Sequence, residues 1–132
     1  MSCWSLLEVA ESGDASCPWP LWKDGVDVED TEGTGCTPLI LASKNGHMAI
    51  VDFLLDEGAE VDKKEWGSGK TALALAAMNG HLEVVQTLVD HDANVNKADE
   101  DGKTPMWLAV RNGHTKVAEW LREMGGTEEA DG

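Results

Sequence analysis

Tyrosine is absent from this sequence, phenylalanine occurs once, and only 10 of the 132 residues are Lys or Arg. Against 25 Asp and Glu residues, this shortage of cations gives a formal net charge of -15. A protein that binds nucleic acid by neutralising phosphates needs a basic surface, so the charge excludes that class. Docking on anionic lipid is disfavoured for the same reason.

Long apolar runs are also missing, since no stretch approaches the ~18 residues of a membrane-spanning helix. Residues 1–11 lack the basic start of a secretory signal, so we expect none. The three cysteines, Cys3, Cys17 and Cys36, are odd in number and confined to the first third of the chain. We therefore expect free thiols, and a protein of the cytoplasm or the nucleus.

The most informative feature is an internal repeat. Three segments align: TPLILASKNGH at 37–47, TALALAAMNGH at 71–81 and TPMWLAVRNGH at 104–114, with a weaker copy at 6–13. A second apolar stripe with helical spacing follows each aligned segment. A further glycine closes these stripes at Gly25, Gly58 and Gly125, where a helix C-cap is expected, but Asp92 stands at the third such position. We therefore predict a positive φ at Asp92.

The Thr-Pro-Leu opening, the Ala pair, the Asn-Gly-His turn and the closing Gly-Ala-x-Val resemble ankyrin repeats over about residues 4–126. The resemblance implies an all-α ankyrin-repeat solenoid of stacked helix–turn–helix units with β-turn fingers between them. It divides the chain into an ankyrin repeat domain, 1–126, and an acidic tail, 127–132. The repeats are expected at about 4–36, 37–70, 71–103 and 104–126.

The residues at the expected helix starts agree with these repeat boundaries. Thr37, Thr71 and Thr104 are suited to cap the first helix of each unit, and Pro38 and Pro105 fit a first helical turn. Two prolines, Pro18 and Pro20, should shorten the second helix of the first repeat. We expect that repeat to be the weakest, with residues 4–30 less protected from hydrogen exchange than 71–95.

Candidate chemical sites have structural explanations. The run GSGKT at 67–71 resembles the end of a phosphate-binding loop, but Lys64 stands where the full motif needs Gly, so we expect an ankyrin turn. His47, His81 and His114 recur once per repeat, which separates them by ~10 Å in a stack. Zinc needs its ligands at ~2 Å, so these histidines are expected to pack between helices. We predict no enzyme activity, no catalytic residue, no metal and no cofactor.

Two roles are open for the Asn96 side chain. Ankyrin proteins can be hydroxylated on the Asn of this position, which the resemblance makes conceivable here. The simpler expectation is that Asn96 forms hydrogen bonds within its own turn.

The resemblance also implies where a partner binds, because family ligands lie across the finger tips and the exposed side of the first helices, the palm. The expected partner-binding residues are Trp66, Ser68, Lys70, Met78, Asn79, Asp99, Asp101, Lys103, Arg111 and Asn112. The fingers are mostly acidic with one large aromatic, which suits a partner with basic and apolar residues. Much of the net charge can equally serve solubility.

Among the tryptophans, Trp19 and Trp66 are expected to be exposed, whereas Trp107 and Trp120 are expected in the core or between repeats. Asp99 and Asp101 are expected on the surface, where replacement costs little stability.

The predicted function is a non-enzymatic protein–protein interaction module: a small, monomeric adaptor or inhibitor that does not bind nucleic acid or membranes. The alternative is a reader of a basic peptide, such as a histone-like tail, through acidic and Trp residues. An aromatic cage for a methylated Lys would need two tryptophans, such as Trp66 and Trp107, to meet around one spot.

Overall fold

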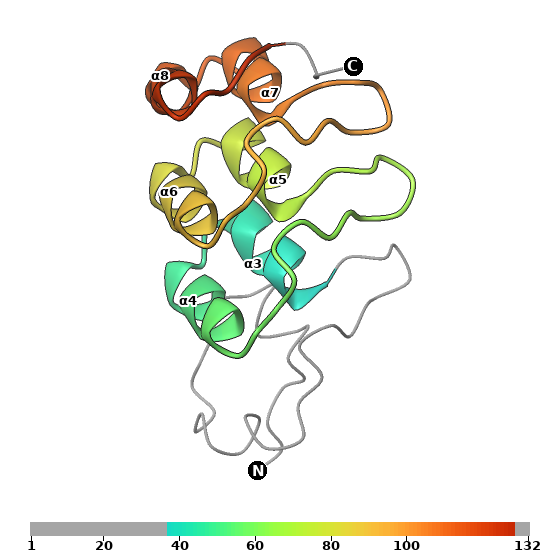
Figure 1. Ribbon diagram of the computed structural model, residues 1–132, viewed down its shortest axis with the longest axis vertical. Coiled ribbons are helices and arrows are strands. Elements are labelled where there is room, and N and C mark those ends of the chain that lie inside the picture. Colours follow the sequence, from blue (N-terminus) through green and yellow to red (C-terminus); the bar gives the residue numbers. More distant parts are fainter. Residues whose placement is uncertain (1–36, 129–132) are drawn as a thin grey trace.

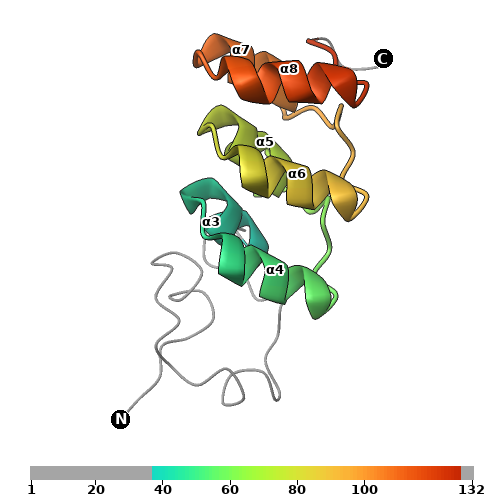
Figure 2. The ribbon, with the colours of Figure 1, turned by 90° about the vertical axis from the view of Figure 1, so that its left-hand side faces the viewer.

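The computed structural model describes residues 37–128, and the expectations for the first repeat, the three cysteines, Trp19 and the end of the acidic tail lie outside them. The described part contains three helix pairs. They are α3 (Pro38–Asn45) with α4 (Met48–Asp56), α5 (Ala72–Met78) with α6 (Leu82–Asp90), and α7 (Pro105–Arg111) with α8 (Thr115–Glu123). Helices α3, α5 and α7 form one layer and α4, α6 and α8 a second (Figure 1). The pairs stack along the long axis of the molecule (Figure 2). The predicted solenoid of stacked helix–turn–helix units is confirmed.

Each first helix begins at a capping threonine, as predicted. The Thr37 Oγ1 accepts a hydrogen bond from the backbone N–H of Ile40 at 3.3 Å, and Thr71 and Thr104 do the same for Ala74 and Trp107 at 3.2 Å. Such caps satisfy one of the backbone donors that a helix leaves unpaired at its start. Pro38 and Pro105 occupy the first turn, where a missing N–H costs nothing.

The second helices end in a left-handed residue. Gly58 has a φ of 89° and Gly125 a φ of 93°, and Asp92 stands at the corresponding place with a φ of 70°. The prediction of a positive φ at Asp92 is therefore confirmed. A side chain at this φ crowds its own backbone, and Asp tolerates the conformation better than most residues because it is short and polar.

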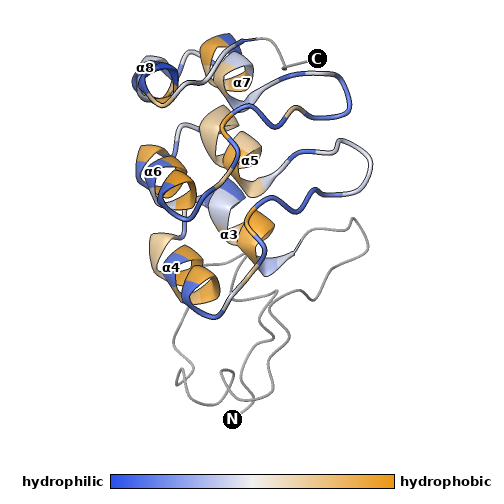
Figure 3. Ribbon diagram, in the orientation of Figure 1, coloured by the Kyte–Doolittle hydropathy of each residue, from blue (hydrophilic) through white to orange (hydrophobic). Residues whose placement is uncertain are grey.

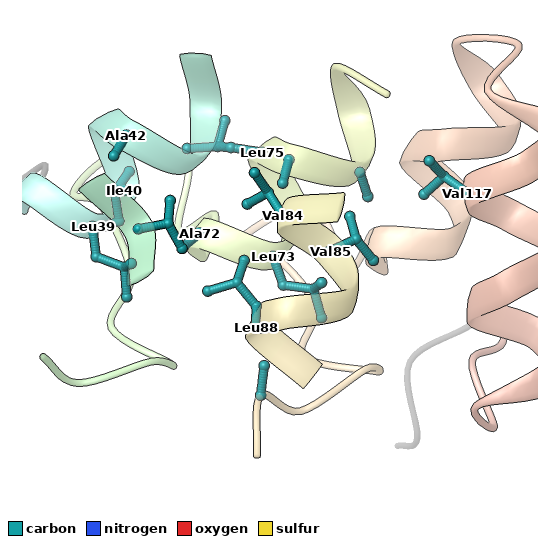
Figure 4. Packing of buried hydrophobic residues seen from close by; sticks show 14 of the residues in the cluster. Leu39, Ile40, Ala42, Ala72, Leu73, Leu75, Val84, Val85, Leu88 and Val117 are labelled. Carbon is teal, nitrogen blue, oxygen red and sulfur yellow. The ribbon is translucent and has the colours of Figure 1, made fainter. Parts of the chain in front are cut away.

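The core runs between the two helix layers. Every residue of α5 from Ala72 to Ala77 is buried, and the small Ala76 and Ala77 are completely buried between neighbouring helices. Leu73, Val84, Val85 and Leu88 fill the space between α5 and α6 (Figure 4). The helices carry the apolar residues, and the projecting loops are largely hydrophilic (Figure 3). No single pair could bury its apolar face alone, so neighbouring pairs complete the core.

A histidine joins successive pairs. The His81 Nε2 lies 3.0 Å from the backbone oxygen of Lys44, in the repeat before it. Gly46 and Gly80 pass so close to the rings of His81 and His114 that an added Cβ would lie 2.7 Å and 2.5 Å from a ring atom. The expected packing of His81 and His114 between repeats is confirmed by these contacts.

Candidate protein-binding surface

Two loops project from the side of the first helices (Figure 1). We call residues 63–70 the second finger and residues 97–103 the third finger. The second finger is closed by an antiparallel bridge between Lys64 and Thr71 and by a 3.0 Å hydrogen bond from the Glu65 N–H to the Lys70 oxygen. The Ser68 hydroxyl donates to the Glu65 carboxylate at its tip. The run GSGKT is thus part of a turn, as predicted.

The two fingers are joined to each other. The Glu100 N–H donates to the Ser68 backbone oxygen at 2.9 Å, and the Lys70 Nζ lies 3.2 Å from the Asp99 Oδ2. Both groups of the ion pair are largely buried, with 17% and 1% of their side chains exposed. The fingers therefore form one supported platform rather than two independent loops.

The expectation that Asp99 lies on the surface is wrong. Its Oδ1 accepts hydrogen bonds from the N–H groups of Asp101 at 2.9 Å and of Lys103 at 3.0 Å, while its Oδ2 pairs with Lys70. Burial by itself would raise the pKa of Asp99, but these hydrogen bonds and the Lys70 charge hold its pKa below the ordinary value. Asp99 is a structural residue that shapes the third finger, and Asp101 is the exposed acid of the pair.

Trp66 lies at the tip of the second finger with 66% of its surface exposed, so the prediction of an exposed tryptophan is confirmed. An indole that remains in water adds little to the stability of the fold. An exposed large aromatic on a supported loop is typical of a contact residue.

The expected palm residues divide into two groups. Met78 is half-buried and Arg111 is exposed, so both are accessible at the ends of their helices. Asn79 and Asn112 are exposed, but their side-chain amides donate to the carbonyls of Leu75 at 2.9 Å and Leu108 at 2.8 Å. Each asparagine amide is therefore already hydrogen-bonded to a carbonyl at the end of its own helix.

Trp107 is not a core residue. Its ring is half-buried and lies beneath two cations, with the Lys103 Nζ 4.4 Å and the Arg111 Cζ 5.9 Å from the ring centroid. Trp120, by contrast, packs against the core as predicted. Sequence reasoning missed the Trp107 cluster, although its signal is visible as a basic residue four positions before and four positions after the tryptophan.

This cluster weakens the case for an aromatic cage. The Trp107 ring is already engaged by cations of its own chain, so a methylated Lys would have to displace them.

The Asn96 side chain forms its hydrogen bonds across repeats, so the expectation that they stay within its own turn is wrong. Its Nδ2 donates to the Gly125 oxygen at 3.1 Å, and its Oδ1 accepts from the Thr127 N–H at 2.9 Å. One bond does stay within the turn, from the Asn96 N–H to Asn94. The side chain thus fastens the C-terminal segment to the preceding repeat.

The described residues bring together no site for metal chemistry. Between Thr37 and Glu128, no group of three or more His, Cys, Asp or Glu residues is placed to hold a metal ion. In the same part of the chain, no helix is long and apolar enough to cross a membrane. What the geometry offers is a surface, made of two joined fingers and the helix ends beside them.

Comparison with known proteins agrees with this geometry. The family model described as "Ankyrin repeats (3 copies)" matches residues 61–130, and the model "Ankyrin repeat" matches residues 34–66. No curated protein matches the chain. Ankyrin repeats are generally modules for protein–protein interaction and are typically not enzymes. Since the first match covers more than half of the chain and the helix pairs stack as the family requires, the chain belongs to the ankyrin repeat family.

Proposed function

We propose that this protein is a small adaptor or inhibitor that acts by occupying a surface of a partner protein. The contact surface consists of the second and third fingers and the adjacent helix ends, and Trp66 is its anchor. The observation that carries the proposal is the 66% exposure of Trp66 at the tip of a finger that is tied to its neighbour.

Burial of the Trp66 side chain by a partner can supply a substantial part of the binding free energy. A tryptophan can bury up to about 250 Å². Covering the two-thirds of its surface that is exposed would contribute up to about 4 kcal/mol at about 25 cal/mol per Å². Because the finger is held by hydrogen bonds and by the Lys70–Asp99 pair, little further ordering is required on binding.

The charge of the fingers favours a partner with basic residues. Glu100 and Asp101 are exposed on the third finger, next to the tip that carries Trp66. Lys70 and Asp99 neutralise each other beneath this surface, so they support the contact without making it. A partner segment with an apolar side chain for Trp66 and a Lys or Arg for the acids fits this arrangement.

We further propose that the protein acts as a monomer in the cytoplasm or nucleus and that nucleic acid and membranes are not its partners. The net charge of -15 supports the second point, because like charges repel phosphate and anionic lipid.

The test is affinity capture from a cell lysate at two salt concentrations, with the wild-type protein, Trp66→Ala and Met124→Ala as baits. Met124 is a suitable control because it is a large apolar residue, 46% exposed, at the end of α8 rather than on a finger. We expect specific proteins on the wild type and on Met124→Ala, fewer at high salt, and loss of them on Trp66→Ala.

The captured protein is then titrated directly. Trp66→Ala should weaken its binding by about 2 kcal/mol or more, as loss of an anchor does. Equal binding by the wild type and Trp66→Ala would show that the finger surface is not the contact site. Unfolding of Trp66→Ala would show that Trp66 is required for the fold.

A further inference from the structure

One carboxylate of the finger surface, that of Glu100, is held in place by the neighbouring finger. Glu100 is exposed on the third finger, and its backbone N–H donates to the Ser68 oxygen of the second finger at 2.9 Å. Its side chain lies across Gly69, which is buried: a Cβ added to Gly69 would lie 2.7 Å from the Glu100 Cγ and 2.8 Å from its Oε1. Contact with the second finger therefore sets the position of the Glu100 carboxylate.

This carboxylate has no cation of its own. Lys70, which directly follows Gly69, pairs instead with Asp99 at 3.2 Å. Among residues 37–128, the Glu100 carboxylate takes part in no ion pair and accepts no hydrogen bond. It therefore keeps both of its oxygens available for the donors of a ligand.

The same stretch of backbone carries Trp66. The Ser68 N–H donates to the Trp66 oxygen at 3.1 Å, and the Ser68 oxygen accepts from Glu100. The backbones of Trp66 and Glu100 are thus each one hydrogen bond from Ser68. A partner segment that covers the exposed indole brings its adjacent side chains to the Glu100 carboxylate.

A carboxylate in a fixed position discriminates between the two cations of proteins. The guanidinium of Arg is planar, and two of its N–H groups can bond in parallel to both oxygens of a carboxylate. The ammonium of Lys is a compact, strongly hydrated point charge, so it gains less from the orientation of its partner. Where the carboxylate can rotate freely, this geometric advantage of Arg is smaller, because the charge dominates the attraction.

On the basis of the finger surface proposed above, we propose that Glu100 selects an Arg of the partner over a Lys. The Arg stands next to the apolar side chain that covers Trp66, and its guanidinium donates two hydrogen bonds to the Glu100 carboxylate. Glu100 is the specificity-determining residue. Gly69 is its positioning residue, because a side chain at Gly69 would occupy the space of the Glu100 side chain.

The probes are peptides selected from a random 12-residue library displayed on phage, with the whole chain as target. Each enriched peptide is synthesised with a fluorescent label in two forms, with Arg or with Lys at its cationic position, and both affinities are measured by anisotropy. Trp66→Ala tests the proposed function, and Glu100→Gln tests the selection of Arg. The matched control is Glu119→Gln, which removes the same charge from an exposed acid on α8.

A second pair of variants moves the carboxylate without removing any charge. Gly69→Ala places a methyl group where the Glu100 side chain lies, whereas the new Cβ of Gly102→Ala meets no atom within 4 Å. Both glycines have a positive φ, 69° and 77°, so the two substitutions strain the backbone to a similar extent.

We expect enriched peptides with an Arg next to Leu, Ile or Phe, and weaker binding of all of them to Trp66→Ala. The wild type, Glu119→Gln and Gly102→Ala should bind the Arg form at least about tenfold more tightly than the Lys form. Glu100→Gln and Gly69→Ala should bind the two forms with nearly equal affinity.

Peptides that need Trp66 but bind equally well with Lys, or that still prefer Arg on Glu100→Gln, would overturn the inference and leave the proposed function standing. Peptides that bind Trp66→Ala as well as the wild type would refute the finger surface itself. A preference for Arg that survives in Gly69→Ala would show that Gly69 does not position Glu100. A selection that enriched nothing would count against both the surface and its specificity.

Discussion

Replacing Asp99 by alanine tests whether this carboxylate holds the third finger together. The substitution removes the acceptor of two backbone hydrogen bonds, from Asp101 and Lys103, and the partner of the Lys70 ammonium. Its sequence position on a turn predicts a change within about 0.5 kcal/mol, as for most surface residues. The structure predicts a much larger effect.

The expected loss in the free energy of unfolding follows from the bonds that the two carboxylate oxygens of Asp99 make. The Oδ1 bonds are hydrogen bonds to a charged group, and each contributes about 1.5 kcal/mol or somewhat more. The Lys70 pair through Oδ2 adds about 1 kcal/mol, because part of the Lys70 side chain still reaches water. We expect Asp99→Ala to lower the free energy of unfolding by about 3 to 4 kcal/mol.

The variant Asp99→Asn separates the backbone hydrogen bonds of Asp99 from its ion pair with Lys70. The asparagine Oδ1 can keep both backbone bonds in their weaker neutral form, but its Nδ2 then faces the Lys70 ammonium, so the loss should be about 2 kcal/mol. The assay is urea unfolding followed by circular dichroism, with Asp101→Ala as the exposed-acid control, expected within about 0.5 kcal/mol of the wild type.

The pH dependence provides an independent check. Since the pKa of Asp99 in the folded protein lies below the ordinary 3.8, its contribution is fully present above that value and is lost as pH falls through the folded pKa. The difference in the free energy of unfolding between the wild type and Asp99→Asn should be constant above about pH 5. It should shrink as the pH falls below about 4. The reasoning is refuted if Asp99→Ala is as stable as Asp101→Ala, or if the difference grows on acidification.

Three further substitutions probe the stack. Asp92→Gly should be neutral or stabilising by up to about 1 kcal/mol in urea unfolding, because glycine adopts the φ of 70° without strain; clear destabilisation would contradict this. Gly80→Ala should cost about 1 to 3 kcal/mol more than Gly113→Ala, since both glycines have a positive φ but only at Gly80 would the new Cβ meet a ring, that of His114; equal melting temperatures would exclude the clash. Asn96→Ala should cost about 1 to 2 kcal/mol and speed amide hydrogen exchange in residues 125–127, and unchanged exchange there would show that the asparagine does not fasten the C-terminal segment.

The sequence by itself determined the architecture. The period of 33 to 34 residues, the helical apolar stripes and the threonine and glycine boundaries each depend on local chemistry that recurs, with few departures, in the units from Thr37 onward. Even the strained Asp92 was predictable, because its siblings in the repeat are glycines. Exposure of Trp66 was predictable too, since the second finger lies outside any apolar stripe.

The tertiary structure alone decided what the polar residues of the fingers and turns do. Asp99 and Asp101 are both acids of one turn, yet only Asp99 points beneath the finger to Lys70, 29 positions earlier in the sequence. Asn96 likewise finds its partners 29 and 31 residues away. Such pairings depend on the packing of one repeat on the next, which brings distant side chains within hydrogen-bonding distance and which no local pattern records. For the same reason, the burial of a position depends on whether another repeat covers it, so Ala77 is in the core whereas Val110, at the same position of the next repeat, meets solvent.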